Sequence, residues 1–551
     1  MKKVVSFLLI AAMALSMIGC GGAADTTTEA PETTKAPVET TASVEETTEA
    51  PSADLTCEIV VVGAGGAGMV SALQAVENGA ESVIIVEKSW LAGGNTIRST
   101  GGMNAAETPN QDANEFKASA GVEKMLNTAK TSWADHKIIS DLAATVEKQY
   151  NDYKANPEGY FDSVELMMLD TMIGGNGIND IELVKALAEN SAAGIAWLKD
   201  AQAADLVQVG AFGGASVNRI HKPVNAEGKT VSVGGYLVPI LEANCKANDK
   251  ITILYETKAT EILMADGAAA GIVVTDANGS YKINAEAVVL ASGGFGANND
   301  MVASFQPNFN GYITTNDPNI TGDGIVMAQA VGAAVVDMEQ IQLHPTVYQK
   351  TAALITEGLR GDGAILVNKE GLRFFDEVST RDKVSAAEFA QTDGVAYLIV
   401  DQAMYDKSAV IAGYDAKGMM IKGETYEELA ANVGMTDAAA FAATMAKWNA
   451  CVEAGVDEEF GRTSFANKLD TAPYYAIEVG PGVHHTMGGL KINANAEVIS
   501  TEGAVIAGLY AAGEITGGVH GGNRLGGNAV ADIVVFGRIA GTSAQAYTSA
   551  N

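Results

Sequence analysis

Cysteine is scarce in this sequence of 551 residues, which contains only 4. Cys57, Cys245 and Cys451 are far apart in the chain, and no two cysteines form a Cys-x-x-Cys pair, so the pattern indicates neither a metal site nor a disulfide framework. The motif Cys-x-x-Cys-His does not occur either, which excludes a c-type haem attached to this polypeptide.

Positive charge is also in short supply, with 35 Lys and Arg against 67 Asp and Glu and a formal net charge of −32. So acidic a surface repels nucleic acid and anionic lipid, and we expect no nucleic-acid partner. It also opposes a small anion, so a site for a carboxylate would need its own cluster of cations. The hydrophobic content of 47% is sufficient for a large core and more than one domain.

The apolar run of residues 4–18 is too short for a comfortable membrane span. Lys2 and Lys3 precede this run and Gly19-Cys20 end it, a pattern that resembles a bacterial lipoprotein signal over residues 1–19. Cleavage of such a signal leaves Cys20 as a lipidated first residue, so we expect an exported protein held by lipid at the outer face of the cell membrane. The alternative is an ordinary secretory signal followed by a chance cysteine.

Residues 20–54 are rich in Thr, Glu, Ala and Pro and have no apolar residues spaced to form a core. This composition predicts a disordered tether. The segment has 8 acidic residues and 1 basic residue, and their mutual repulsion favours an extended chain.

The glycine-rich turn Gly63-Ala64-Gly65-Gly66-Ala67-Gly68 follows a buried strand predicted over residues 58–62 and precedes a helical pattern. Glycines permit the tight turn and let backbone N–H groups approach a pyrophosphate at the positive end of the helix. A second strand, predicted over residues 83–86, ends in Glu87, where an acid can accept hydrogen bonds from a ribose. A glycine turn often merely closes a βα unit, but the two strands, the helix and the acid together indicate dinucleotide binding.

Residues 90–105 form a second glycine-rich stretch, WLAGGNTIRSTGGMNA, which could lie along an extended dinucleotide. A compact nicotinamide-binding fold would not need it, so FAD is favoured over NAD. Two more buried strands are predicted directly before Gly293-Gly294 and Gly513-Glu514, where small residues let the backbone meet a cofactor. A single turn of this kind is more often just a tight loop. Only the several turns together, each after a predicted strand, favour one large cofactor.

The ordered set of motifs GGN…GGMNAA, ASGGF, QLHPT, TEGLRG, STRDK, HHTMGG, AAGE and GGNRLGGNA runs from about residue 55 to 548. With the glycine turn it resembles the fumarate reductase and succinate dehydrogenase flavoproteins, most closely the flavoprotein part of the soluble flavocytochrome c fumarate reductases, without the haem domain. The resemblance implies an α/β fold in which a Rossmann-like FAD-binding domain, residues 55–336 and 478–551, carries an inserted α+β capping domain at 337–477. It also implies hydride transfer from reduced flavin to the C=C bond of a small unsaturated carboxylate, with fumarate ranked first.

The resemblance assigns proton transfer to three residues, with Arg381 as the proton donor and Glu357 and Arg360 as its relay from solvent. A guanidinium has a pKa above about 12 and seldom gives up its proton, so Arg381 would have to be resupplied. The i, i+3 spacing puts Glu357 and Arg360 on one face if the segment is helical. Without the resemblance, both arginines would be interpreted as surface cations paired with nearby acids such as Glu377 and Asp382.

The resemblance assigns substrate binding to His344, Thr356, His484 and Arg524. The planar guanidinium of Arg524 can bind a carboxylate bidentately, and the other three match donors that hold and twist the carboxylates. Twisting polarises the double bond for hydride attack. His485 is expected to be a neighbour of the site.

We expect FAD to contact several segments of the chain. The predicted contacts are Gly63, Gly65, Gly66, Ala67, Gly68, Glu87, Lys88, Asn95, Thr96, Thr100, Gly101, Gly102, Gly294, Asp323, Glu514, Ala529 and Val530. Asn95 stands where the membrane-bound relatives carry a histidine bonded to flavin, so non-covalent FAD is predicted, and no metal ligand is assigned. Electrons are expected from a separate haem or flavin carrier at the membrane surface.

Phe212 and Leu354 stand where the soluble fumarate reductases use methionines, a change that could reshape the pocket for a bulkier acid. Alternative substrates are therefore urocanate and acrylate- or cinnamate-type acids, or a steroid ketone to be dehydrogenated. A non-enzymatic solute-binding lipoprotein is the alternative from another class, although it has no need of a dinucleotide cradle. His221 is expected to have a structural place near the site.

Overall fold

The computed structural model describes residues 53–114 and 120–550. The predicted signal and nearly all of the predicted tether therefore lie outside the described residues. Among the described helices, none is long and apolar enough to cross a membrane.

The larger sheet has eight strands and contains the predicted nucleotide-binding strands. Its order is β18-β19-β9-β1-β2-β6, and β8 pairs with both β9 and β7. The strands are β1 (Leu55–Val62), β2 (Val83–Val86), β6 (Ile251–Leu254), β7 (Lys258–Ala265), β8 (Ala268–Asp276), β9 (Gly279–Leu290), β18 (Glu497–Ile499) and β19 (Val505–Ala511). β1 pairs in parallel with both β2 and β9, and because helices cover both faces of such strands, its run Ile59–Val62 is apolar throughout and buried.

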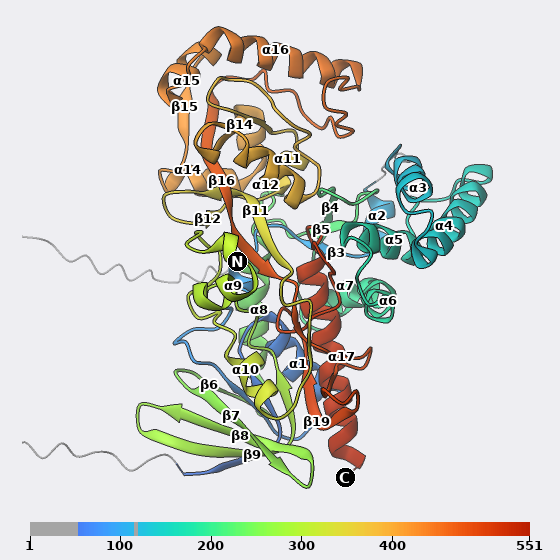
Figure 1. Ribbon diagram of the computed structural model, residues 1–551, viewed down its shortest axis with the longest axis vertical. Coiled ribbons are helices and arrows are strands. Elements are labelled where there is room, and N and C mark those ends of the chain that lie inside the picture. Colours follow the sequence, from blue (N-terminus) through green and yellow to red (C-terminus); the bar gives the residue numbers. More distant parts are fainter. Residues whose placement is uncertain (1–52, 115–119, 551) are drawn as a thin grey trace, which may run out of the picture. The chain divides into compact units, whose positions relative to one another are not determined.

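Helix α1 (Gly66–Glu77) follows β1 directly and packs along α17 (Asn528–Ala550), so the two ends of the folded chain lie side by side (Figure 1). Small residues allow this close approach, because a Cβ on Gly541 would overlap the carbonyl oxygen of Ser71 in α1. The packing brings the first turn of α17, with Ala529 and Val530, to the glycine turn after β1.

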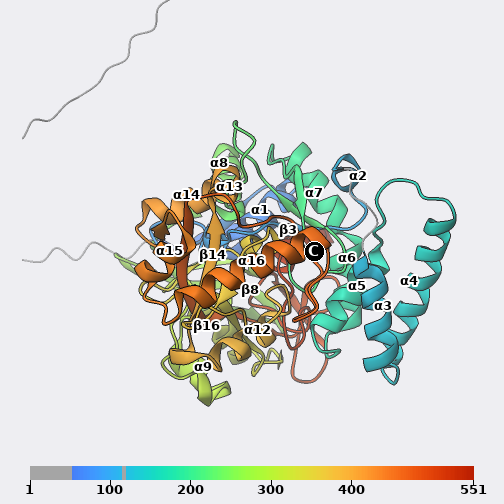
Figure 2. The ribbon, with the colours of Figure 1, turned by 90° about the horizontal axis from the view of Figure 1, so that it is seen from above.

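Helices α3 and α4 project from this part on the side away from α15 in both views, and α4 packs against α5 (Figure 1 and Figure 2). The helices are α2 (Pro109–Ala113), α3 (Ala120–Ser132), α4 (Lys137–Ala155), α5 (Val164–Gly174), α6 (Ile181–Glu189), α7 (Ser191–Asp200), α8 (Val233–Ala247), α9 (Asn299–Phe305), α10 (Asp323–Ala330), η1 (Thr96–Arg98) and η2 (Pro307–Phe309). The short strands are β3 (Met103–Asn104), β4 (Gln208–Gly210) and β5 (Ile220–Lys222) in one sheet and β10 (Val335–Val336) and β17 (Gly489–Leu490) in another.

A second hydrophobic core, with members from Tyr348 to Val479, surrounds a mainly antiparallel sheet. Its strands are β11 (Ile341–Tyr348), β12 (Ala353–Leu354), β13 (Ile365–Val367), β14 (Ala396–Asp401), β15 (Ile421–Gly423) and β16 (Tyr474–Thr486). Its helices are α11 (Gly358–Gly361), α12 (Arg381–Phe389), α13 (Gln402–Lys407), α14 (Ala409–Ala416), α15 (Tyr426–Val433), α16 (Ala438–Ala454) and the short η3 (Thr392–Gly394). The α/β class with a second α+β unit is confirmed, while the boundaries 337 and 477 stay a prediction.

Strand β16 links the two parts. Its first residues pair with β14 inside the second core, and its last residues pair with β11 (Figure 1). The pairing places His484, near the end of β16, beside His344 on β11, although the two are 140 positions apart in the sequence.

Candidate active site

One cavity extends from the glycine turn after β1 to the histidines of β11 and β16. Its lining includes the predicted substrate residues and all of the predicted cofactor residues except Gly68 and Gly294. These two glycines lie behind the wall, where a Cβ on Gly68 would overlap the carbonyl oxygen of Gly63 and one on Gly294 would overlap the hydroxyl of Thr486. The lack of a side chain at these two positions therefore allows close packing of the backbone. The predicted contacts of the other residues with cofactor and substrate stay predictions.

The glycine turn has the geometry of a pyrophosphate cradle. Gly63 has φ +106°, and a Cβ there would lie 2.6 Å from the carbonyl oxygen of Ala291, so only glycine fits without strain. Helix α1 begins beyond Gly65, which has no side chain to cap it, and the N–H of Gly66 donates to the hydroxyl of Thr96 at 3.0 Å. The other N–H groups at the positive end of the helix are left to an anion at the cavity. These features fit the diphosphate of FAD.

Glu87 joins the ends of β1 and β2. Its Oε2 accepts a hydrogen bond from the N–H of Ala64 at 3.0 Å, and its Oε1 accepts one from the N–H of Ser89 at 2.9 Å. Burial raises the pKa of Glu87 above the ordinary value, against the opposing effect of these hydrogen bonds. Each oxygen retains a free lone pair, as an acceptor for a ribose hydroxyl requires.

The side chain of Asn95 is held by three partners. Its Nδ2 donates to Asn316 Oδ1 at 2.6 Å and to Glu514 Oε2 at 2.9 Å, and its Oδ1 accepts from the N–H of Asp317 at 2.8 Å. An amide has no nucleophilic atom with which to bond a flavin. Position 95 therefore fits a non-covalent cofactor.

His344 and His484 form an edge-to-face pair with ring centroids 4.8 Å apart. Burial, together with the charges of Arg381 and Arg524, lowers the pKa of both histidines well below the ordinary value, so they are neutral at pH 7. Nδ1 of His344 accepts a hydrogen bond from the N–H of Thr346 at 3.1 Å, which places the ring proton on Nε2. His344 can thus donate to a substrate oxygen. His484 is held by the hydroxyl of Thr315, 2.7 Å from its Nδ1.

Arg381 is 5% exposed and binds Glu357, which lies 24 positions earlier. Its Nε and Nη2 donate to Glu357 Oε2 at 2.8 and 2.5 Å, while Arg360 Nη2 lies 3.3 Å from Glu357 Oε1. Burial raises the pKa of Glu357, but the two arginines outweigh it and keep the pKa below the ordinary value. The structure thus excludes surface ion pairing of Arg381 and joins the three residues of the predicted relay.

Gln342 is a site residue that the sequence reasoning missed. Its Oε1 accepts from Arg381 Nη1 at 2.8 Å and from Arg524 Nη2 at 3.2 Å, and its Nε2 donates to the carbonyl of Arg524 at 2.7 Å. Gln342 precedes His344 by two positions on β11, and alternation along a strand puts both on the same face. That spacing was the signal that could have revealed it.

Arg524 is 4% exposed, and its Nε has no hydrogen-bond partner among the described residues. Burial, with the charge of Arg381, lowers its pKa to about 9, so it stays charged at neutral pH. A buried guanidinium with an unused donor at a cavity fits a carboxylate ligand, because charged donors are costly to leave unpaired. The predicted cationic cluster is therefore present despite the net charge of −32.

Phe212 forms an aromatic part of the cavity wall and lies against glycines of three segments. A Cβ on Gly101 would lie 2.7 Å from its ring, one on Gly358 would lie 3.2 Å from it, and one on Gly526 would overlap it. Leu354 also lines the cavity. The wall is thus made of bulky apolar groups with fixed positions.

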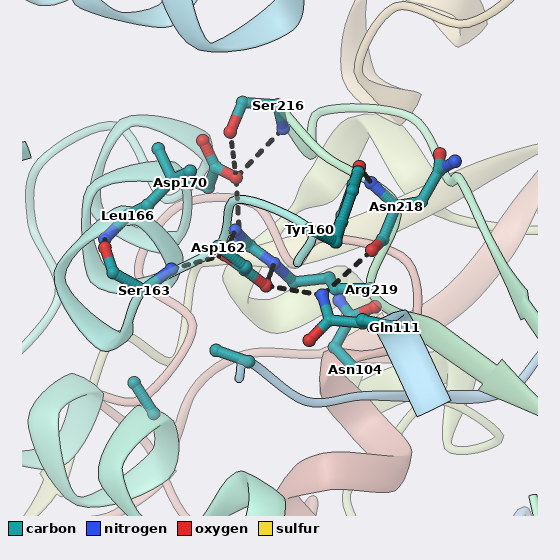
Figure 3. A network of polar contacts seen from close by, with 12 residues as sticks. Asn104, Gln111, Tyr160, Asp162, Ser163, Leu166, Asp170, Ser216, Asn218 and Arg219 are labelled. Atoms are coloured by element: carbon teal, nitrogen blue, oxygen red, sulfur yellow. Dashed lines mark hydrogen bonds and ion pairs between the residues drawn. The ribbon is translucent and has the colours of Figure 1, made fainter. Parts of the chain in front are cut away.

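A buried ion network anchors the loop that carries Phe212 (Figure 3). Asp170 on α5 accepts from the N–H and the hydroxyl of Ser216, both at 2.9 Å, and from Arg219 Nη1 at 2.8 Å. Arg219 also donates from Nη2 to Asp162 at 2.6 Å. All three ionic side chains are buried, so removal of one partner would leave an uncompensated charge.

A dinucleotide cradle that opens into a pocket of arginines and neutral histidines defines the class of FAD-dependent oxidoreductases. The family model described as FAD binding domain matches residues 58–159 and 149–530. A fumarate reductase (cytochrome) of Shewanella frigidimarina is 42% identical over 498 residues, covering 90% of this chain and 78% of the relative. A urocanate reductase of Eggerthella lenta is 36% identical and covers 89% and 74%.

The solved open conformation of a flavocytochrome c3 fumarate reductase superposes with a TM-score of 0.67 at 38% identity, covering 90% of this chain and 79% of that one. The chain therefore belongs to the FAD-binding flavoprotein family that includes these reductases. The resemblance inferred from the motifs is confirmed, and with it FAD as the cofactor.

Proposed function

We propose that this protein reduces the C=C bond of a small unsaturated dicarboxylate, with fumarate giving succinate. The observation that carries the proposal is the convergence of Arg524, Arg381 and the two neutral histidines at one end of the FAD cavity. The names of the relatives, fumarate reductase and urocanate reductase, support this chemistry.

Substrate binding requires donors for two carboxylates. Arg524 supplies a charged donor for one of them, and His344, through Nε2–H, supplies a neutral donor in the same pocket. His484 and Thr356 line the pocket as further polar groups. Donors from different segments of the chain hold the two ends of the substrate. The rate of reduction therefore depends on how the substrate is positioned rather than on unusually reactive groups.

FAD, when bound in the cradle, supplies the hydride. Arg381 then gives a proton to the other carbon of the double bond, and the guanidinium must be reprotonated before the next turnover. Glu357 Oε2, 2.5 Å from Arg381 Nη2, is placed to return the proton, and Arg360 is the next group behind it. Hydride and proton together convert the C=C bond to CH–CH, and no other redox change is needed.

A bulkier acid is the second candidate substrate. Phe212 and Leu354 support it, since they replace the flexible methionines expected in a fumarate pocket with a fixed apolar wall. An aromatic or imidazole acrylate could stack on such a wall. Retention of both histidines and Arg524 favours the dicarboxylate.

The test is anaerobic reoxidation of the dithionite-reduced protein by a panel of unsaturated acids, followed at the flavin absorbance. Rapid reoxidation by fumarate that is lost in Arg381→Ala, with FAD still bound, is the expected result. Reoxidation only by urocanate or cinnamate would move the assignment to the second candidate. A colourless purified protein would discard the enzyme and support a solute-binding lipoprotein.

We also propose that lipid on Cys20 holds the enzyme at the outer face of the membrane, where a separate haem or flavin protein supplies electrons. The apolar run ending in Gly19-Cys20 supports the anchor. Incorporation of labelled fatty acid into the wild-type protein and not into Cys20→Ser is the expected result, and labelling of both would contradict it.

A further inference from the structure

Glu388 is a buried carboxyl group that the relay described above does not use. It lies on α12, the helix that begins with Arg381, and its side chain is 0% exposed. Neither of its oxygens has a hydrogen-bond partner within residues 53–114 and 120–550. An ionised carboxylate in this position would be costly, and burial raises the pKa of Glu388 well above the ordinary value. Burial therefore favours the neutral, protonated form of this acid.

The surroundings of Glu388 lead towards the active site. Positions 381, 385 and 388 fall on one face of α12, because residues four and seven apart in a helix align. Ser385 on this face is 2% exposed, and its hydroxyl also has no partner in the described part of the chain. The charged group that acts on Glu388 is Arg360, whose Nε and Nη2 are buried without a hydrogen bond there.

A bound ligand does not account for these unpartnered atoms. Arg360, Ser385 and Glu388 are not among the residues that line the FAD and substrate cavity. A structural role does not account for them either, because a carboxyl group without a hydrogen bond holds no element in place. What remains is a row of polar groups behind the catalytic arginine, from Arg381 through Glu357 and Arg360 to Glu388.

We propose that Glu388 is the proton reservoir of the relay and supplies Arg381 through Arg360 and Glu357. This inference rests on the proposed reduction of a C=C bond, which consumes one proton per turnover. The O–H bond of Glu388 breaks and an N–H bond of Arg381 forms again, with protons passed along the two groups between them and no electron transferred. Glu388 then takes a proton from solvent; the next residue, Phe389, ends α12 and is 43% exposed, so the surface is near.

No direct hydrogen bond joins Glu388 to Arg360 in this arrangement, so the transfer needs a bridge. The hydroxyl of Ser385 and the Nε–H of Arg360 offer the polar partners that a bridging water requires. Glu388 touches neither substrate nor cofactor and acts through Arg360, so it is a positioning residue for the proton and not a catalytic one.

The test uses the full-length FAD-bound enzyme with Glu388→Gln and Glu388→Leu. Gln keeps the shape of the side chain and Leu removes its polar atoms, and since the carboxyl group has no hydrogen-bond partner, neither substitution breaks an existing hydrogen bond, so both variants are expected to fold. Asp382→Asn, which removes an exposed carboxyl group from the same helix, is the matched control. Turnover is measured with fumarate and reduced methyl viologen from pH 6 to 9, in H2O and in D2O.

Both Glu388 variants are expected to keep FAD and the wild-type KM for fumarate. Their kcat is expected to fall roughly 10-fold to 100-fold, which is at or below the lower end of the effects seen when an acid–base group is lost. The solvent isotope effect on kcat is expected to rise, because proton resupply becomes slow, and Glu388→Asp is expected to recover part of the rate. A merely structural residue would not change the isotope effect.

Full kcat and an unchanged isotope effect in both variants would overturn the proposal, and so would failure of both to fold, which would show that the carboxyl group serves the fold. The activity of the wild-type protein distinguishes failure of this proposal from failure of the proposed function. Wild-type enzyme that does not reduce fumarate refutes the function, whereas active wild-type enzyme matched by Glu388→Gln refutes only the reservoir.

Discussion

The buried imidazole of His221 is expected to make the stability of the protein depend on pH. Its Nδ1 lies 2.9 Å from the carbonyl oxygen of Arg219 and must donate, so its Nε2, 2.7 Å from the hydroxyl of Thr108, is the unprotonated nitrogen. The side chain is 0% exposed, and burial lowers its pKa to about 4. His221 is thus neutral in the folded protein over most of the acidic range.

The sign and size of the effect follow from the difference between the folded and unfolded pKa. The unfolded chain binds a proton at His221 below about pH 6.5, whereas the folded chain binds it only below about pH 4, so acid favours unfolding between these values. At about 1.4 kcal/mol per pKa unit, the contribution of His221 to the free energy of unfolding falls by roughly 2.5 kcal/mol from pH 7.5 to 4.5.

His221→Gln tests this reasoning, because an amide can donate to Arg219 and accept from Thr108 but does not titrate. The variant is expected to be about 1–2 kcal/mol less stable than the wild type at pH 7.5 through imperfect packing. Urea unfolding at pH 4.5, 5.5, 6.5 and 7.5 should show this difference shrink and then reverse as the pH falls. The other histidines titrate in both proteins and cancel. A difference that stays constant over the range would refute the pKa and the hydrogen-bond assignment together.

Three further predictions concern the site. Glu357→Gln removes the carboxylate between two buried arginines, so fumarate turnover should fall roughly 100-fold or more while the flavin absorbance of the purified protein is kept; unchanged turnover would contradict the relay. Gly68→Ala should yield protein largely without FAD, because the new Cβ overlaps the carbonyl oxygen of Gly63, whereas Gly413→Ala, with open space around it, should keep FAD at the wild-type ratio. Phe212→Ala should lower kcat/KM for cinnamate relative to fumarate by about 10-fold, because it removes the aromatic wall on which the ring of the acid could stack, and an unchanged ratio would show that Phe212 does not contact the substrate.

The nucleotide-binding part was predictable because its signals are local. The turn Gly63–Gly68 lies between β1 and α1 within a single βα unit, and Glu87 follows the next strand along the chain. Backbone conformation and packing there are decided by which residues lack a Cβ, and the sequence displays this directly. The cofactor class could therefore be inferred before any tertiary contact was known.

The environment of Arg381 could not be inferred in that way. From sequence alone, its neighbours along the chain suggest a surface ion pair, whereas in the fold it is buried against Glu357 and Gln342. This burial arises when β11, α11 and α12 pack together, and those contacts join segments up to 39 positions apart. The role of Arg381 as proton donor follows only from the resemblance to a family. That resemblance assigns no role to Gln342 or Glu388.

The charge balance of the pocket explains why an acidic protein can bind a dianion. The guanidinium groups of Arg381, Arg360 and Arg524 are buried, and among the described residues Glu357 is the one carboxylate in ion-pair contact with any of them. Both histidines are neutral at pH 7, and burial raises the pKa of Glu388, the other acid that acts on Arg360. Arg381 and Arg524 line the cavity, and Arg524 has no ion-pair partner among the described residues, although the acids Glu514 and Asp532 act on it from outside contact distance. A dicarboxylate can bring a negative charge to both Arg524 and Arg381, whereas a monocarboxylate reaches only one of them, and a buried cation without a counter-charge is costly, so the charge of the pocket favours a dicarboxylate.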